Sequence, residues 1–293
     1  MSEKGTLSTG GRKKVTLGDL YAKMERGEPI TMLTCYDYPT ATFMEQAGVD
    51  IVLVGDSLGM TILGYDSTLP VTMEMMIPHA QAVRRGTPSA FLVGDMPYMT
   101  YQPSTERAIL NAGRFMAEAA CDCVKLEGGL EVVERVKGIV DSGIPVMGHL
   151  GLTPQSAIAL GGFRVQGRSA PQAKKIIDAA RALEDAGVFS ILLEMVPDRV
   201  CELITARASV PIISLGSGPK AHGQLLIFHD MFGLYPKFKP KMAKVYGNAG
   251  QVILDGLKAY VAEVRSGAFP QPENWFGIKD DQFAELKKLL GEG

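Results

Sequence analysis

The stretch "DIVLVGDSLGM" at residues 50–60 contains the pattern that decides the fold. Its apolar and small residues, 51–55, are rich in β-branched Val and Ile, and the run ends at Asp56. The stretch "SAFLVGDMPY" at residues 89–98 repeats the pattern, with an apolar run that ends in Val-Gly-Asp at Asp95. Continuous apolar runs of this length are typical of strands buried on both faces of a parallel sheet. Two such strands side by side would bring two carboxylates to one place.

Short apolar runs along the whole chain predict eight strands. They lie at residues 30–35, 51–56, 90–95, 123–127, 144–149, 189–194, 210–216 and 225–230. Helical patterns separate most of them, at residues 39–48, 103–119, 130–143, 169–187 and 197–209, and several are followed closely by Gly, a typical helix stop. Strands that alternate with helices in this way predict a (β/α)8 TIM barrel of the α/β class. The competing fold, a doubly wound open sheet, does not need eight strands.

Further helical patterns lie before and after the predicted barrel. An extra N-terminal helix is expected at residues 15–27, and C-terminal helices are expected at residues 249–267 and 280–291. We expect residues 1–14 to be a disordered tail. Since no linker interrupts the rest, we expect residues 15–293 to form a single barrel domain that includes the C-terminal helical extension.

The composition excludes several classes of protein. Of the 293 residues 46% are hydrophobic and 21% charged, which is typical of globular proteins, and a net charge of -2 gives no electrostatic footprint for nucleic acid. No apolar run of about 18 residues predicts a membrane span, and the N-terminus has no apolar signal-peptide core. The four Cys lack metal-binding spacing and are typical of buried thiols in a reducing compartment. We therefore expect a cytoplasmic protein that binds neither nucleic acid nor membranes.

Polar residues end most of the predicted strands, at the end of a barrel where enzymes hold their active sites. These residues are Asp37, Asp56, Asp95, Lys125, Glu127, His149, Glu194, His229 and Asp230. An Asp after a strand is often the N-cap of the next helix, and this alternative stays open. The matching ends at Asp56 and Asp95 favour a metal site instead, because two adjacent carboxylates repel each other unless a cation joins them. Mg²⁺ takes oxygen ligands and commonly uses one or two carboxylates.

Four further polar residues each allow a structural and a functional interpretation. Lys125 would form a salt bridge to Glu127 or a neighbouring Asp, or hold a substrate carboxylate or oxyanion. Glu127 would cap the following helix or support the metal. Glu194 would cap the helix after Pro197, or act as a general base whose pKa is raised by its apolar neighbours. His149 is a core or loop-bracing residue, or a part of the site.

Longer motifs in this chain, in order and with matching spacing, resemble the ketopantoate hydroxymethyltransferase (3-methyl-2-oxobutanoate hydroxymethyltransferase) family. They read "TCYDYPTA", "VGDSLGM", "GYDSTLPV", "AVRRG", "VKLEGG", "GHLGLTPQS", "GGFRVQGR" and "HDMFG", and the likeness runs from about residue 15 to residue 270. The resemblance implies a (β/α)8 barrel that uses Mg²⁺ to transfer a one-carbon unit from 5,10-methylenetetrahydrofolate to 3-methyl-2-oxobutanoate. The product, ketopantoate, leads to pantothenate and coenzyme A. The resemblance further implies small-molecule substrates and a homo-oligomer, commonly a decamer of two five-membered rings.

The same motifs imply roles for individual residues. The implied metal ligands are Asp56, Asp95 and Glu127, the last either directly or through water. The implied contacts to the keto acid are Asp56, Ser57, Asp95 and Lys125.

The implied catalytic residues are Glu194, Lys125 and His149. Glu194 matches the family's base and would remove the C3 proton of the keto acid, while Lys125 would add positive potential at the substrate carboxylate. His149 matches a residue near the site. The resulting enolate, stabilised by Mg²⁺, would attack the methylene group of the folate.

The chain departs from the family pattern at His222, where an Asp usually precedes the Gly-Gln that opens the eighth strand. This change touches the rim and leaves the metal and base positions intact. A rival assignment is another Mg²⁺-dependent barrel acting on 2-oxo acids, such as a C–C lyase or a phosphoenolpyruvate mutase relative. Those families typically carry a Cys-containing catalytic loop, which "GDMPYMTYQP" and "KLEGG" lack. A second rival, a non-catalytic barrel, would not need Lys125 and Glu194 together with both Asp residues.

Overall fold

A closed barrel of eight parallel strands forms the centre of the protein, as described by a computed structural model of residues 11–237 and 240–292. The strands follow one another around the barrel in chain order. They are β1 (Ile30–Thr34), β2 (Ile51–Val54), β3 (Phe91–Asp95), β4 (Cys123–Glu127), β5 (Val146–Gly151), β6 (Ser190–Glu194), β7 (Ile212–Leu215) and β8 (Gly223–Leu226). The predicted (β/α)8 barrel is confirmed.

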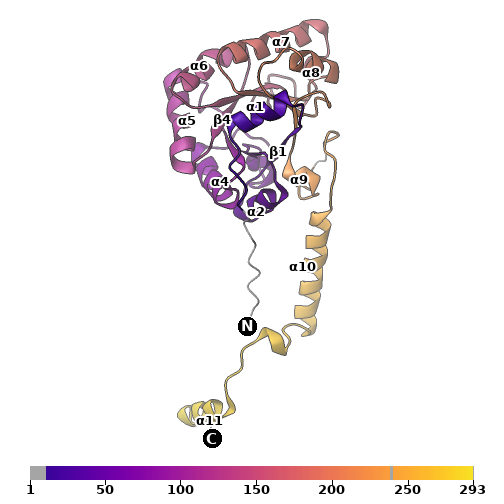
Figure 1. Ribbon diagram of the computed structural model, residues 1–293. Coiled ribbons are helices and arrows are strands. Elements are labelled where there is room, and N and C mark those ends of the chain that lie inside the picture. The colour runs from indigo at the N-terminus through magenta and orange to yellow at the C-terminus, as the bar shows by residue number, and fades with distance from the viewer. Residues whose placement is uncertain (1–10, 238–239, 293) are drawn as a thin grey trace.

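Helices surround the barrel and extend beyond it (Figure 1). The α-helices are α1 (Leu17–Glu25), α2 (Tyr38–Ala47), α3 (Leu58–Thr61), α4 (Met73–Gly86), α5 (Thr105–Ala119), α6 (Val133–Asp141), α7 (Ala170–Asp185), α8 (Asp198–Thr205), α9 (Phe228–Met231), α10 (Ala249–Ser266) and α11 (Asp280–Leu289). Short 3₁₀ helices are η1 (Leu130–Val132), η2 (Pro154–Ser156) and η3 (Pro272–Asn274). The sequence predicts no helix at α4, whose interior contains Pro78, a residue that normally interrupts a helix. Its buried face, with Met76, Ala80 and Val83, packs it onto the barrel.

The predicted position of the eighth strand, residues 225–230, is wrong. The strand begins at Gly223, where an added Cβ would lie 2.6 Å from the carbonyl oxygen of Ile30 in β1, so only glycine allows this close approach. After Leu226 the chain leaves the ladder, because the backbone N–H of Phe228 donates to Oγ1 of Thr34 at 3.1 Å. His229 and Asp230 therefore lie on α9 rather than at the end of a strand.

Alternation along the strands divides the core into two layers. In β4, Cys123 belongs to the cluster that fills the barrel interior, whereas Val124 and Leu126 belong to the cluster beneath the surrounding helices. Lys125 and Glu127 share the inward parity of Cys123, so both side chains stand on the interior side, towards the carboxyl end. The apolar interior layer thus forms a floor beneath the polar strand ends.

The described part of the N-terminal segment contacts the barrel. Residues 1–10 of the expected tail lie outside the described residues, but Arg12 donates to the carbonyl oxygen of Val49 and Lys14 to that of Ala90, each at 2.8 Å. The tail therefore does not reach residue 14.

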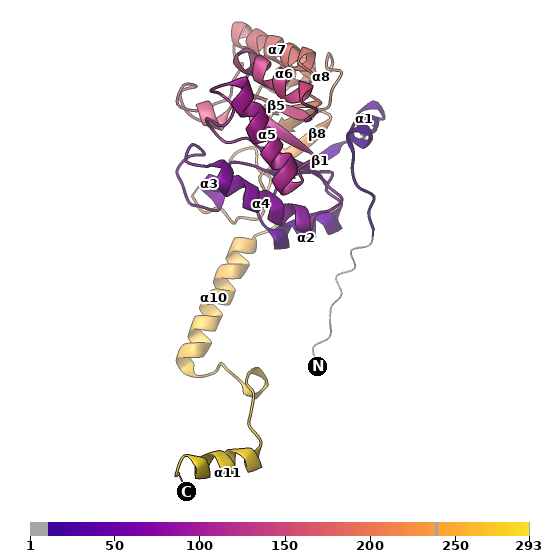
Figure 2. The same cartoon turned by 90° about the vertical axis from the view of Figure 1, so that its left-hand side faces the viewer.

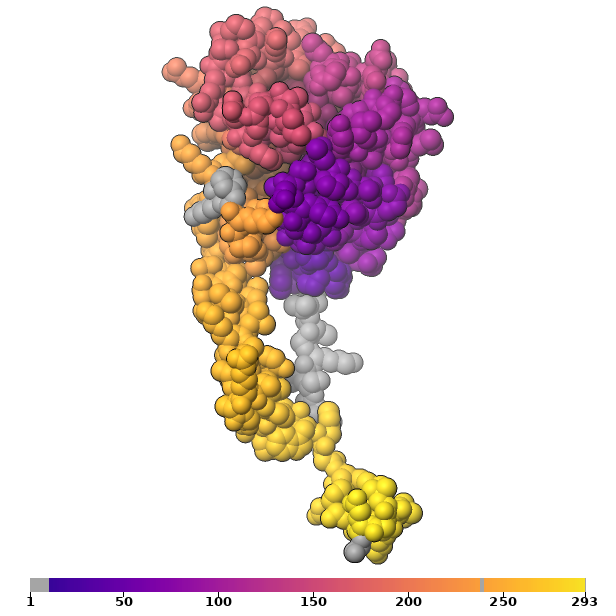
Figure 3. Space-filling model, turned by 180° about the vertical axis from the view of Figure 1, so that it is seen from behind, coloured from indigo at the N-terminus to yellow at the C-terminus, as the bar shows by residue number. Residues whose placement is uncertain are grey.

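The C-terminal helical extension forms an arm outside the barrel. Figures 1 and 2 show α10 projecting away from the barrel and α11 beyond it, and the arm is equally plain in Figure 3. Every described residue from 251 to 292 is exposed. None of the helices in the described ranges is long and apolar enough to cross a membrane.

Gly94, directly before the inward-facing Asp95, provides a test of how tightly β3 is packed. Its added Cβ would lie 2.4 Å from the ring of Phe115 in α5. We predict that Gly94→Ala lowers the free energy of unfolding by about 1–3 kcal/mol through overpacking, measured by urea denaturation followed by circular dichroism. Gly113→Ala in α5 is the control: its Cβ meets nothing within 4 Å, and alanine should stabilise the helix by about 0.5–1 kcal/mol. Wild-type stability in Gly94→Ala would contradict this packing.

Candidate active site

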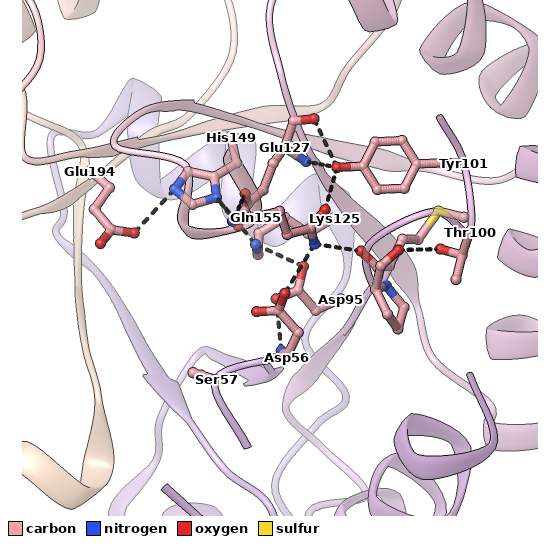
Figure 4. A network of polar contacts seen from close by, with 12 residues as sticks. Asp56, Ser57, Asp95, Thr100, Tyr101, Lys125, Glu127, His149, Gln155 and Glu194 are labelled. Atoms are coloured by element: carbon pink, nitrogen blue, oxygen red, sulfur yellow. Dashed lines mark hydrogen bonds and ion pairs between the residues drawn. The ribbon is translucent and has the colours of Figure 1, made fainter. Parts of the chain in front are cut away.

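The barrel brings six of the predicted site residues together at its carboxyl end (Figure 4). They are Asp56 after β2, Asp95 on β3, Lys125 and Glu127 on β4, His149 on β5 and Glu194 on β6. Strand register sets the neighbours: Asp95 pairs with Lys125 in the ladder, and Glu127 pairs with His149. None of the six is more than 8% exposed. Their charges therefore interact in a medium that screens them weakly.

An ion pair between Lys125 and Asp95 joins β4 to β3. Lys125 Nζ lies 2.7 Å from Asp95 Oδ1, and both side chains are buried. Burial alone would lower the pKa of Lys125, but the charges of Asp95, Glu127 and Asp56 outweigh it and raise the pKa. The salt-bridge interpretation of Lys125 is confirmed, and the lysine stays fully charged at neutral pH.

Asp56 faces this pair from β2. The backbone N–H of Asp56 donates to Asp95 Oδ2 at 3.0 Å, and Gln155 Nε2 donates to Asp56 Oδ2 at 3.0 Å. Burial raises the pKa of Asp56 well above its ordinary value, and the charges of Asp95 and Glu127 raise it further. Three carboxyl groups thus surround one lysine, and a bound cation would offset the cost of ionising them.

Of the acids that follow strands, Asp37 caps the next helix, whereas Asp56 and Glu194 do not. Asp37 is the N-cap of α2, accepting from the backbone N–H of Thr40 at 2.8 Å. Asp56 precedes the short helix α3, yet the N-cap position is Ser57 and no side chain caps that helix. Glu194 likewise does not cap α8, whose N-cap residue is Pro197. The carboxylates of Asp56 and Glu194 therefore face the barrel interior instead of a helix end.

Glu127 lies between the Asp pair and His149. Its Oε2 accepts from the backbone N–H of Gln155 at 2.9 Å, and its Oε1 lies 3.5 Å from His149 Nδ1. Burial raises the pKa of Glu127 to about 8, although Lys125 opposes the shift. It does not cap the next helix, since no side chain caps η1.

Glu194 and His149 form a second polar pair across the site. His149 Nε2 lies 3.2 Å from Glu194 Oε2, and Lys125 Nζ lies 3.3 Å from His149 Nδ1. An ammonium group can only donate, so Nδ1 accepts and the neutral ring carries its proton on Nε2, facing Glu194. Burial raises the pKa of Glu194, while the contact with His149 lowers it. Burial also lowers the pKa of His149, which favours the neutral ring.

The sequence analysis missed two residues of this network, Tyr101 and Gln155. The Tyr101 hydroxyl lies 2.9 Å from the carbonyl oxygen of Glu127 and 2.8 Å from Gln155 Oε1. Both side chains are buried. Gln155 lies within the family motif "GHLGLTPQS" and Tyr101 within the loop "GDMPYMTYQP", and this place in the sequence is the signal that could have found them. Ser57, which was predicted, contacts Tyr36 instead of the acids, with 2.7 Å between the two hydroxyl oxygens.

The possible metal ligands in this site are carboxylate oxygens of a few Asp and Glu residues. No group of three or more His, Cys, Asp or Glu side chains in residues 11–237 and 240–292 is arranged to hold a metal ion by itself. Asp56 and Asp95 could therefore supply only part of a coordination shell, which matches the habit of Mg²⁺ to keep water and substrate oxygens as ligands.

Solved structures of other proteins share this fold. A phosphonopyruvate hydrolase solved with oxalate and Mg²⁺ superposes with a TM-score of 0.58 at 13% identity, covering 94% of this chain and 95% of its own. A 2,3-dimethylmalate lyase of the PEP mutase/isocitrate lyase superfamily gives a TM-score of 0.56 at 13% identity, covering 94% and 99%. At such low identity the likeness concerns the barrel fold alone.

Sequence relatives are much closer. The 3-methyl-2-oxobutanoate hydroxymethyltransferase of Moorella thermoacetica is 53% identical over 265 residues, covering 90% of this chain and 98% of that protein. The enzyme of the same name from Desulfotalea psychrophila is 51% identical over 261 residues, covering 89% and 94%. A sequence model of the ketopantoate hydroxymethyltransferase family matches residues 14–272. The chain therefore belongs to the ketopantoate hydroxymethyltransferase family of transferases.

Proposed function

We propose that this protein transfers a hydroxymethyl group from 5,10-methylenetetrahydrofolate to 3-methyl-2-oxobutanoate, which yields ketopantoate for pantothenate biosynthesis. The observation that carries the proposal is the buried Asp56–Asp95 pair, with Lys125 beside it and the Glu194–His149 pair nearby. The names of relatives about 50% identical to this chain support the reaction. The overall transfer consumes one water, whose oxygen becomes the new hydroxyl group.

Asp56 and Asp95 are the residues that would hold Mg²⁺. Burial and the nearby Asp95 and Glu127 raise the pKa of Asp56, and a divalent cation would favour the ionised carboxylates beyond what Lys125 alone provides. When bound, the cation would supply Lewis-acid polarisation of the keto oxygen and stabilise the enolate. Glu127, whose Oε2 accepts from the backbone N–H of Gln155, would support the metal directly or through water.

Lys125 and Ser57 are the residues that would hold the keto acid. The ammonium group of Lys125 is kept charged by its buried acidic neighbours, and such a fixed cation attracts a carboxylate without reorganisation. Ser57 offers a hydroxyl group whose orientation is set by Tyr36. Together they favour a small 2-oxo acid over an uncharged ketone.

Glu194 would remove the C3 proton. Its side chain is buried at the end of a strand, directly after the apolar residues Ile191 to Leu193, so its pKa is raised towards the range useful for a base. His149 Nε2 lies 3.2 Å from Glu194 Oε2, and this contact lowers the pKa of Glu194 against the larger effect of burial. His149 is thus a positioning residue for the base.

The exposed arm supports the expectation of a homo-oligomer. The helix α10 exposes a set of large apolar side chains: Val252, Ile253, Leu254, Leu257, Tyr260, Val261 and Val264. Soluble monomers rarely expose a contiguous apolar surface of this kind. We propose that further copies of the chain cover it, and that the assembly works in the cytoplasm.

Replacement of a metal ligand tests the proposed reaction. We predict that the wild type forms ketopantoate only with Mg²⁺, the folate and the keto acid together, measured by mass spectrometry of the product. Asp95→Asn should lower Mg²⁺-dependent turnover and Mn²⁺ affinity by about 100-fold or more, since even outer-shell changes cost 10–100-fold. Asp37→Asn is the matched control, because asparagine also caps helices well. A wild type without product, or an active Asp95→Asn with normal metal affinity, would contradict the proposal.

The role of Glu194 as the base can be tested by proton exchange in the absence of the folate. We predict that the wild type with Mg²⁺ exchanges the C3 proton of 3-methyl-2-oxobutanoate for deuterium, followed by NMR. Glu194→Gln should abolish this exchange, because glutamine is isosteric but cannot take the proton. Glu134→Gln, on the exposed face of α6, should exchange at the wild-type rate. Normal exchange in Glu194→Gln would remove Glu194 as the base.

The pH profile of this exchange gives a further prediction. The base must be ionised, and burial raises the pKa of Glu194 above its ordinary value of 4.5. Exchange should therefore be full above the raised pKa and be lost as the pH falls through it. The midpoint of the acid limb, measured on the wild type at saturating Mg²⁺, should lie above 4.5. A midpoint at or below that value would show that the base is not a buried carboxylate.

A further inference from the structure

Gln155 is the residue that connects the acidic groups of the site to the loop after β5. It lies in η2 and is buried, although glutamine is normally a surface residue. Its backbone N–H donates to Glu127 Oε2 at 2.9 Å, and its side-chain Nε2 donates to Asp56 Oδ2 at 3.0 Å. One residue thus holds two carboxylates that come from different strands.

The side-chain amide of Gln155 can point in only one direction. Nε2 has two protons, and they meet Asp56 Oδ2 and the carbonyl oxygen of Met96, at 3.0 and 2.9 Å. Oε1 accepts from Gln102 Nε2 at 3.1 Å, and Tyr101 Oη lies 2.8 Å from it. Both N–H groups of the amide have acceptors, and a flipped amide would set oxygen against oxygen at Asp56 and Met96. The N–H that faces Asp56 is therefore fixed in place.

The contact distinguishes the two oxygens of Asp56. Hydrogen bonds within the described part of the chain occupy Oδ2 and leave Oδ1 without a protein donor. A neutral amide orients the carboxylate without neutralising it, whereas a second lysine here would cancel the charge that attracts a cation. Outer-shell hydrogen bonds of this kind orient the ligands of metal sites.

We propose that Gln155 is a positioning residue for the metal site: its amide holds Oδ2 of Asp56 and so keeps Oδ1 available to the divalent cation. The inference rests on the proposed function, since it requires that Asp56 bind a cation. It assigns to the loop after β5 a part in metal binding beyond the strand-end acids. A purely architectural role for Gln155, as an anchor of the loop, is the alternative.

Metal binding by variants of Gln155 distinguishes the positioning role from the architectural role. The probe is Mn²⁺, titrated into the full-length, metal-free protein without substrates and followed by electron paramagnetic resonance. Gln155→Met keeps the length of the side chain but removes both N–H groups, and we expect its Mn²⁺ dissociation constant to rise by about 10–100-fold. The Mg²⁺ concentration that gives half-maximal C3 exchange should rise by the same factor, with a maximal rate close to that of the wild type.

Gln102→Met is the matched control. It makes the same chemical change in a neighbour that contacts Gln155 Oε1 but donates to neither Asp56 nor Glu127 in the described network. We expect its Mn²⁺ affinity to stay within about twofold of the wild type. Equal losses in both variants, or a lower melting temperature of Gln155→Met with unchanged Mn²⁺ affinity, would overturn the inference in favour of the architectural role.

Two further results complete the test. If Gln155→Met does not fold, Gln155→Asn retains a polar amide but withdraws it by one methylene group, and wild-type Mn²⁺ affinity in that variant would overturn the inference. If the wild type itself binds no Mn²⁺, the proposed metal chemistry fails and the inference with it. Normal wild-type binding with unchanged binding in the Gln155 variants would overturn the inference alone.

Discussion

The buried ion pair between Asp95 and Lys125 is the contact on which the rest of the site depends. It sets one positive charge among three carboxylates, in an interior where a charge without a partner is costly. Removing either partner would leave the remaining charges unbalanced, with the apolar floor of the barrel beneath them. Burial raises the pKa of the neighbouring Asp56 and Glu127. A divalent cation that favours their ionised forms is therefore a fitting ligand.

Strand alternation explains how such a group of charges can be buried at all. Inward positions near the amino ends of the strands are apolar, for example Cys123 and Met147, and the next inward positions along the same strands are Lys125 and His149. The barrel is thus built as an apolar core with a polar upper layer. Because the strand register fixes this layer, the acids cannot move apart without disrupting the ladder. The loops contribute further hydrogen bonds to this polar layer, such as those of Tyr101 and Gln155.

Two pairs of residues divide the tasks of the proposed reaction. The carboxylates of Asp56 and Asp95 would bind a cation. Glu194 would act as the base, and His149 would position it. Lys125 connects them, since it contacts Asp95 on one side and His149 on the other. Its charge holds the neutral tautomer of His149 and so affects the base that it does not touch.

The sequence by itself determined the barrel class and the set of strand-end acids, because both follow from local patterns: continuous apolar runs, helix stops and residues such as Asp56 and Asp95 placed just where those runs end. It misplaced β8 and overlooked α4, since a close approach at Gly223 and the packing that tolerates Pro78 depend on neighbours distant in the chain. Whether an Asp caps a helix, as Asp37 does, or turns into the barrel was decided only by tertiary structure. The same is true of Gln155, whose partners come from separate strands and loops and meet only when the barrel closes.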